Sequence, residues 1–205
     1  MALTTVTLHA HALGSVEDVA AYLKLNSIPV SDEAELFKTI INAATERVEN
    51  YCRRPFLQRT LNEFFDGTGT RRLYLRAHPV ISVSQIDALN FEGDSIRTYT
   101  SSDIRVDTAH GIVLLKNGGS FGEGLQNWQV QYVAGWNLLT DVPEAVRLGF
   151  YKLCAEYWRD FQNRKDDIQS ITAEGQTVFF NQEVMPPRIA GLLKPYQIPA
   201  GMVDL

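Results

Sequence analysis

The hydrophobic repeat of this 205-residue chain changes twice, and the two changes constrain its fold more than any other feature. Apolar residues recur at helical spacing up to residue 52, at every second position in the segments between residues 61 and 134, and at helical spacing again after residue 143. A helix turns once in about 3.6 residues, whereas the side chains of a strand alternate between two faces. The sequence therefore predicts helices on both sides of a block of strands.

The first change of repeat lies at Pro55, within the stretch RVENYCRRPF. A proline pushes the residue before it out of the helical conformation, so the preceding helix should stop there. We expect Arg53 and Arg54 at the C-terminus of that helix, where the helix dipole favours positive charge.

Two long helical patterns flank the block of strands, at residues 31–52 and 141–167. Each pattern has one apolar stripe and a polar opposite side, which is typical of a helix that packs on a core. We expect the two stripes to pack on each other. The predicted contact residues are Phe37, Ile41, Val48, Phe150, Leu153 and Tyr157.

Shorter helices are predicted near both ends of the chain. Ser15 is a candidate N-cap for a helix over about residues 16–24, with Asp18 at the third helical position. Pro187 suits the first turn of another short helix, which must end before Pro195.

Seven short segments between the long helices are rich in β-branched and aromatic residues, a composition typical of strands. Turn signals such as DGTG, FEGD and TAHG separate them. Strands joined by short turns favour an antiparallel meander or a small sandwich. The predicted strand segments are LNEFF, RRLYLR, VSQIDAL, IRTYT, DIRVD, GIVLL and WQVQYVAG.

The predicted fold class is α+β: a helical core of two long helices plus shorter helices, with an antiparallel β-sheet inserted between the long helices. Residues 168–185 fit either an extended hairpin or a mobile loop. The predicted organisation is an N-terminal arm (1–14), a helical domain (15–56 and 136–194), an inserted β domain (57–135) and a C-terminal tail (195–205).

Composition and charge exclude several classes of protein. The formal net charge of -5 does not fit a strongly basic nucleic-acid-binding surface. Cys52 and Cys154 lie within helical patterns and are expected as small buried hydrophobes rather than as a disulfide framework. No apolar run is long enough for a membrane span, and the first residues do not resemble a signal peptide.

The sequence shows no catalytic, cofactor-binding or metal-binding motif. The glycine-rich stretch at residues 117–124 lacks the following Lys and Ser/Thr of a phosphate-binding loop, so we expect a hairpin loop. His9 and His11 are too few to hold a metal ion. His78 and His110 lie at turns, without the nucleophile motif of a hydrolase.

Three stretches give this layout a family resemblance. AELFKTIINAATERVENYCRRPF is a helix that closes on an arginine and an aromatic residue, and HPVISVSQI follows the first pair of strands. In VQYVAGWNLLTDVPEAVRLGFYKLCAEYW a strand ends in a Tyr-x-Ala-Gly-Trp turn, and Val-Pro-x-Ala-Val starts the next helix. In this order, residues 16–200 resemble the head–tail connector (adaptor) proteins of tailed bacteriophages and gene transfer agents.

The resemblance implies a structural virion protein and not an enzyme. Such proteins assemble in the host cytoplasm into a ring of about twelve copies beneath the portal protein, at the neck of the virion. The ring extends the DNA channel, through which DNA passes without sequence-specific binding, and contacts the stopper or tail-completion protein. No cofactor and no membrane is implied. Because their C-terminal segment reaches the portal, the candidate portal-binding residues are Leu192, Leu193, Tyr196, Ile198 and Met202.

Two alternatives stay open at this point. Another neck or tail component, a head-completion stopper or a tail terminator, would contain mostly strands, and the two long helices argue against it. A small β-rich enzyme would need polar residues that converge in a pocket, and the sequence shows no such set.

Overall fold

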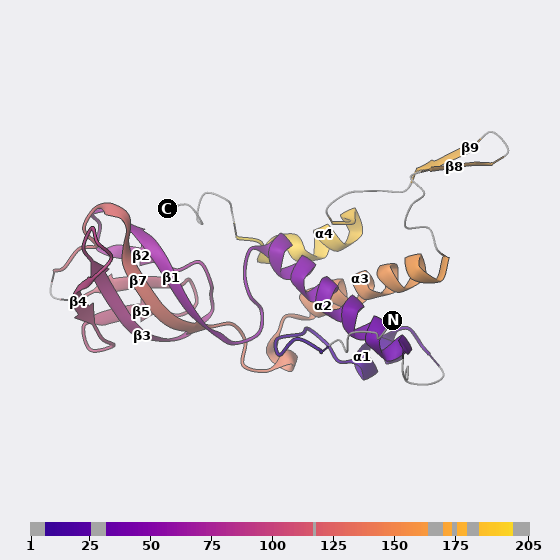
Figure 1. Ribbon diagram of the computed structural model, residues 1–205, viewed down its shortest axis with the longest axis horizontal. Coiled ribbons are helices and arrows are strands. Elements are labelled where there is room, and N and C mark those ends of the chain that lie inside the picture. The colour runs from indigo at the N-terminus through magenta and orange to yellow at the C-terminus, as the bar shows by residue number, and fades with distance from the viewer. Residues whose placement is uncertain are drawn as a thin grey trace. The chain divides into compact units, whose positions relative to one another are not determined.

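The computed structural model describes residues 7–25, 32–116, 118–163, 170–173, 176–179 and 185–198 (Figure 1). The chain divides into two compact units. The helical unit is formed by residues 1–52 and 142–197, and the β unit by residues 53–141 and 198–205. The chain therefore leaves the helical unit after α2 and returns to it before α3.

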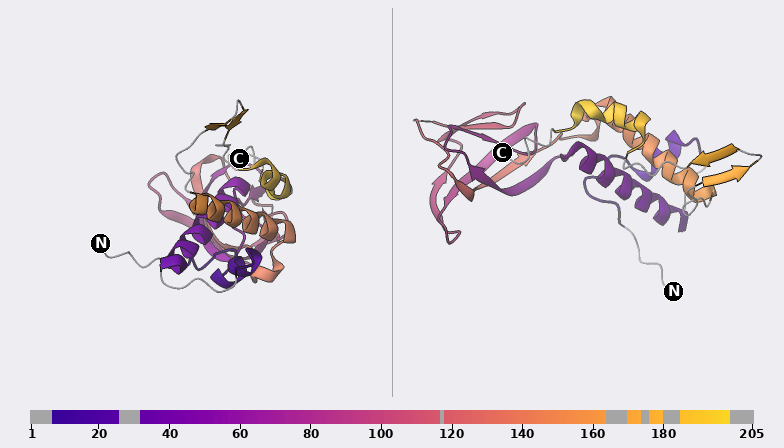
Figure 2. Two further views of the ribbon diagram at one scale, coloured as in Figure 1. Left: turned by 90° about the vertical axis from the view of Figure 1, so that its right-hand side faces the viewer. Right: turned by 90° about the horizontal axis from the view of Figure 1, so that it is seen from above.

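Four α-helices build the helical unit, and α3 contacts both α2 and α4 (Figure 2). Gly149 allows the close approach of α3 to α4, because a Cβ atom at this position would lie 3.1 Å from Leu193 Cδ2. Phe37 of α2 packs on Trp158 of α3, with ring centroids 4.7 Å apart. The helices are α1 (Val16–Tyr22), α2 (Asp32–Cys52), α3 (Glu144–Asn163) and α4 (Pro187–Leu193), and a 3-10 turn, η2 (Lys194–Tyr196), follows.

The predicted cap of the first helix is confirmed. The Ser15 hydroxyl accepts a hydrogen bond from the Asp18 backbone N–H, and the Asp18 carboxylate accepts one from the Ser15 N–H, which is a capping box. Residues 7–13, predicted as part of an arm, contact α2. The Leu13 N–H donates to Thr45 Oγ1, and the Leu13 side chain is fully buried. The described part of this segment therefore belongs to the helical core.

Most of the predicted helix contact residues are buried. Phe37, Ile41, Val48, Phe150 and Leu153 have no exposed surface. Tyr157 is half-buried, and its hydroxyl accepts a hydrogen bond of 2.8 Å from Arg47 Nη1. The apolar stripes of α2 and α3 thus face the interior of the helical unit, as their periodicity indicates.

The β unit contains two antiparallel sheets. The four-stranded sheet has the order β1-β7-β3-β4, and the three-stranded sheet has the order β2-β6-β5. Every predicted strand segment is present. The strands are β1 (Arg59–Gly67), β2 (Arg72–Tyr74), β3 (Val80–Leu89), β4 (Ser95–Tyr99), β5 (Ile104–Asp107), β6 (Ile112–Leu115) and β7 (Gly124–Ala134), with a 3-10 turn η1 (Leu139–Asp141) after them.

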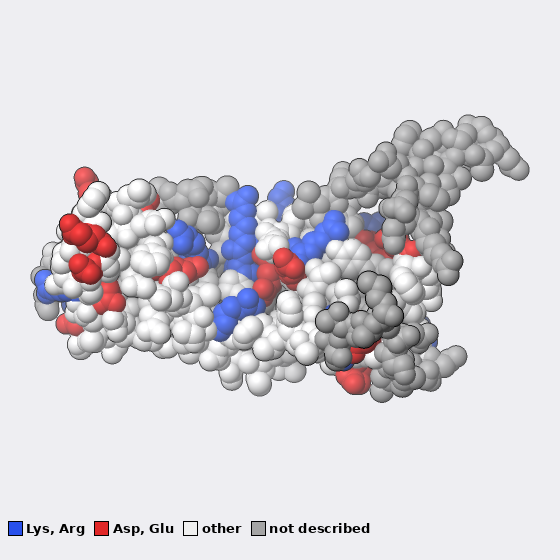
Figure 3. Space-filling view, viewed as in Figure 1, with Lys and Arg blue, Asp and Glu red and all other residues white. Residues whose placement is uncertain are grey.

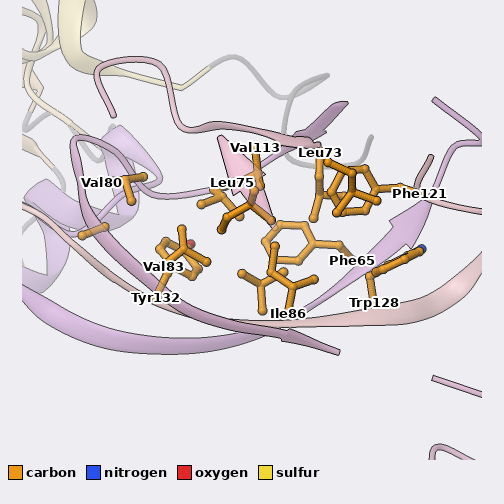
Figure 4. Close-up of a cluster of buried hydrophobic side chains, with 14 of the residues drawn as sticks. Phe65, Leu73, Leu75, Val80, Val83, Ile86, Val113, Phe121, Trp128 and Tyr132 are labelled. Carbon is orange, nitrogen blue, oxygen red and sulfur yellow. The ribbon is translucent and has the colours of Figure 1, made fainter. Parts of the chain in front are cut away.

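One hydrophobic cluster fills the β unit (Figure 4). Phe65, Ile86 and Tyr132 come from the four-stranded sheet, whereas Leu73 and Val113 come from the three-stranded sheet. Residues from both sheets thus share one core, which is the arrangement of a small β-sandwich.

A further pair of strands lies in the segment that fitted either a hairpin or a loop. β8 (Ser170–Ala173) pairs antiparallel with β9 (Gln176–Phe179). The other residues between 164 and 184 lie outside the described residues.

The predicted fold class is wrong. We expected a core of two long helices with one antiparallel sheet inserted between them. The described residues are instead mixed, with four helices of 7 to 21 residues, two antiparallel sheets that enclose a core of their own, and the β8–β9 pair. Alternation along a strand indicates that one face is buried, but it does not reveal which strands pair. The sequence therefore could not separate one meander from two sheets.

Replacing Phe150 by Ala should lower the free energy of unfolding by about 3–5 kcal/mol, because a large buried side chain leaves a cavity. Phe150 has no exposed surface, whereas Phe161 of the same helix is 51% exposed. The matched change Phe161→Ala should cost less than about 1 kcal/mol. Urea unfolding of both variants tests this, and equal losses would contradict the assignment of the buried face.

Candidate interaction surfaces

The junction at the start of the β unit is organised by a buried arginine. α2 ends at Cys52, and Arg53 then adopts a positive φ of 57°, a conformation common after the last residue of a helix. Arg54, predicted at the helix C-terminus, is instead 8% exposed within the β unit, and its Nη2 atom donates to the His78 carbonyl oxygen. The helix itself ends at Cys52, as the predicted pattern over residues 31–52 indicates.

Two aromatic rings flank the Arg54 guanidinium. Its Cζ lies 5.1 Å from the Trp136 ring centroid and 5.7 Å from that of Phe56, and the two rings stack on each other. Such contacts stabilise a cation through the ring quadrupole. The Trp136 N–H donates to the Phe56 carbonyl oxygen, which ties the two ends of the β unit together. This cluster explains why the sequence places RRPF at this point.

His78 lies beside this cluster and is held in its neutral form. Burial is the largest cause of a pKa lowered to about 4, and the positive charge of Arg54 and the neighbouring His110 lower the pKa further. His110 itself is exposed and contacts the Asp107 carboxylate at 3.0 Å. The two histidines expected at turns therefore differ: His78 belongs to a buried junction and His110 to the surface.

An open groove of about 390 Å³ lies on the helical unit. Tyr51 and Tyr157 supply its aromatic walls, and Arg47 binds the Tyr157 hydroxyl group within it. The Gln197 side-chain amide donates to the Tyr51 carbonyl oxygen at 3.0 Å. The last described residues of the chain are therefore anchored next to a groove of mixed aromatic and charged character.

The predicted portal-binding residues are not all accessible. Leu193 has no exposed surface and Ile198 is 6% exposed, while Leu192 and Tyr196 are half-buried. Met202 lies outside the described residues. Of the candidates within residues 185–198, only Leu192 and Tyr196 are therefore partly accessible to a partner.

Exposed apolar side chains gather in the β unit instead, which sequence reasoning missed. Phe91 at the β3–β4 turn is fully exposed, and Ile96 and Leu125 are 68% and 83% exposed. The turn that carries Phe91 is well ordered by local bonds: Asp94 N donates to Asn90 Oδ1 at 2.7 Å, and Asn90 N to the Asp94 carbonyl oxygen. The FEGD turn signal was visible in the sequence, but the outward direction of Phe91 was not.

The structure also shows where the glycine-rich stretch and the two cysteines lie. The glycine-rich stretch leads from β6 to β7, and Phe121 within it is fully buried in the β core. Cys52 and Cys154 are both buried, as expected, and burial raises the pKa of the Cys154 thiol. Within the described residues, no three His, Cys, Asp or Glu side chains form a group that could hold a metal ion. No helix in the described part of the chain is both long and apolar enough to cross a membrane.

Figure 3 shows one face of the molecule, on which most of the surface is neither acidic nor basic. Acidic side chains lie mainly at the left of this view, and basic ones lie mainly near its middle. The β unit between residues 53 and 141 contains equal numbers of acidic and basic residues. Strong binding to phosphates requires clustered cations, so this surface does not favour it.

Comparison with known proteins gives a family and a fold. A family model described as "Head completion protein" matches residues 12–198. A search of curated proteins finds no match.

The fold is similar to those of chains in solved particle structures. A chain of the structure described as "Neck of empty GTA particle computed with C6 symmetry" has a TM-score of 0.65 at 15% identity, over 97% of this chain and 96% of the other. A chain of "Virion of native gene transfer agent (GTA) particle" has a TM-score of 0.62 at 14% identity, over 98% and 100%. A chain of "Neck of native GTA particle computed with C12 symmetry" has a TM-score of 0.60 at 15% identity, over 97% and 96%.

The pKa of His78 predicts a loss of stability in mild acid. Its folded-state pKa of about 4 lies below the usual 6.5, so the unfolded chain binds the proton first as the pH falls. The stabilisation is complete above pH 6.5 and is lost as the pH falls towards 4. Between pH 7 and pH 5, the urea midpoint should therefore fall more for the wild type than for His78→Gln.

The matched control is His9→Gln, because His9 is exposed on the segment before α1. This variant should keep the pH dependence of the wild type. If His78→Gln also kept it, the buried junction would not be the source of the acid sensitivity.

Proposed function

This chain belongs to the head completion protein family, and we propose that it is a structural component of the virion neck, where several copies form a ring beneath the portal protein. The ring would continue the DNA channel of the portal and offer a surface to the stopper or tail-completion protein. The resemblance to head–tail connector proteins is confirmed at the level of this family.

The family match carries the proposal because it covers both units of the chain, from residue 12 to residue 198. The fold supports it. Similar chains occur in gene transfer agent necks whose structures were computed with C6 and C12 symmetry. A rotationally symmetric ring uses two different surfaces of each subunit, which bind each other around the ring.

The surface chemistry suits a channel protein. DNA that must slide through a ring should not be held by clustered cations, because each phosphate contact adds affinity. The equal numbers of acidic and basic residues in the β unit and the overall charge of -5 both disfavour such holding. This supports a passage for DNA rather than a binding site for it.

The proposed contact with the portal lies at the C-terminal end of the chain. Leu193 and Ile198 are buried, so they would support the segment from within rather than dock on a partner. Leu192 and Tyr196 are half-buried and can contribute contact area, and Met202 remains a candidate. The segment starts from a fixed point, since Gln197 is bonded to Tyr51.

Removal of residues 199–205 should weaken portal binding while leaving the folded chain intact. The truncated chain keeps the buried Ile198 and the Gln197 bond, so its melting temperature should change by less than about 2 °C. Binding to purified portal rings should fall at least about tenfold, which corresponds to about 1.4 kcal/mol.

The control is Gln197→Ala in the full chain, which removes the bond to Tyr51 but keeps residues 199–205. It separates the effect of losing that bond from the effect of losing the tail. A truncated chain that bound the portal as well as the wild type did would contradict the portal contact. Electron microscopy of the full chain mixed with portal rings should show an added ring of density on the portal.

The same experiment separates the rival assignments. Binding to portal rings only in the presence of another neck protein would favour the assignment as a head-completion stopper or tail terminator. Particles from a strain that lacks this protein distinguish the structural role from an enzymatic one, since a structural role predicts DNA-filled heads without tails. Restoration of tails by substoichiometric amounts of the protein would favour an enzyme.

A further inference from the structure

The four-stranded sheet of the β unit has two long free edges. β1 and β4 are its outermost strands, and among the described residues each pairs with a neighbouring strand on one side only. Figure 1 shows the strands of the β unit. β1 spans nine residues and β4 spans five. A free edge offers a row of backbone donors and acceptors to any strand that approaches it.

Each edge carries charged side chains and one irregularity in its register, but not the residues that block pairing most strongly. Neither β1 nor β4 contains a proline or a lysine, the residues that commonly block an edge. Ile96 on β4 and Phe64 on β1 are 68% and 43% exposed. By contrast, the edges of the three-stranded sheet are short, because β2 has three residues and β5 has four.

The two long edges run in opposite directions. β1 is antiparallel to β7, β7 to β3, and β3 to β4, so β4 is antiparallel to β1. When identical copies follow one another around a ring, β4 of one copy would therefore meet β1 of the next in antiparallel orientation. Antiparallel pairing is the more stable arrangement for neighbouring strands.

The side chains at the two edges are compatible with such a joint. Thr98, Asp87, Gln129 and Phe64 occupy one row across the sheet, from β4 to β1. Within this row the Asp87 carboxylate already accepts hydrogen bonds from Thr98 Oγ1 at 2.5 Å and from the Ser95 hydroxyl at 3.1 Å. The Asp87 carboxylate is therefore hydrogen-bonded within its own copy, and the side chain of this row at the β4 edge is the uncharged Thr98.

We infer that neighbouring copies join through these edges, with β4 of one copy pairing antiparallel to β1 of the next. The four-stranded sheets then continue from copy to copy around the ring. This inference rests on the proposed ring, and it assigns the two different surfaces that such a ring requires. The occupant of each edge is a second copy of this chain.

Cysteine cross-linking tests the joint in assembled particles. The variants combine Thr98→Cys on β4 with Thr60→Cys, Asn62→Cys or Phe64→Cys on β1, one at a time. The three β1 positions share a face of the sheet and cover successive registers, since side chains alternate along a strand. Cys52 and Cys154 are fully buried and should not react.

A short bis-maleimide should convert at least one double variant into a ladder of dimers, trimers and larger species on a denaturing gel. Each single-cysteine variant should remain a monomer, because the two edges differ. Dimers from Thr98→Cys alone would indicate twofold pairing of two β4 strands and would overturn the inference. A ladder that appeared only after removal of residues 199–205 would show that the chain's own tail occupies an edge. This result would also overturn the inference.

A second pair of variants covers the case in which a cysteine variant fails to fold. Ile96→Lys adds a charge to the β4 edge and should weaken association of copies about tenfold, whereas Leu125→Lys, on the central strand β7, should not. Equal behaviour of the two lysine variants would overturn the edge assignment.

The proposed ring and the proposed joint can fail separately. If the particles contain the ring but no double variant gives a ladder, the edges are not the joint and the ring stands. If the chain does not associate with the portal at all, the proposed function itself is wrong.

Discussion

The pairing of β1 with β7 is the contact on which the rest of the structure depends. It aligns the first and last strands of the β unit over Arg59↔Ala134 to Phe65↔Trp128. Because these strands lie about seventy residues apart along the chain, their pairing fixes where the polypeptide leaves the helical unit and where it returns. Loop closure of this length is costly in entropy, so it must be offset by the long ladder and the shared core.

The junction beside this pairing adds specificity at the same place. Arg54 is buried against two stacked aromatic rings and bonded to the His78 carbonyl oxygen, which restricts the path of the first residues of the β unit. Gly135 permits the return path, because it has a φ of 106° and a Cβ atom there would lie 2.7 Å from the Leu57 backbone. A buried cation with aromatic contacts is costly to misplace, which favours one register over its alternatives.

The functional conclusion depends on surfaces rather than on a pocket with reactive groups. The family assignment covers both units, and the edges of the four-stranded sheet are the surfaces for the proposed contact with other copies. In the proposed ring, the outer strands β1 and β4 would not stay unpaired, because β4 of one copy pairs with β1 of the next. The same edges would be a hazard in a protein that acts alone.

The sequence by itself determined the helices, the strands and many of the buried residues. The capping box at Ser15, the apolar stripes of α2 and α3 and the seven strands follow from local periodicity and turn chemistry, which neighbouring residues decide. Only the tertiary structure decided the division into two sheets, the burial of Arg54, Leu13 and Phe121, and the exposure of Phe91 and Ile96. These depend on which distant strand or helix a segment meets, and a repeat along one segment has no information about its partner.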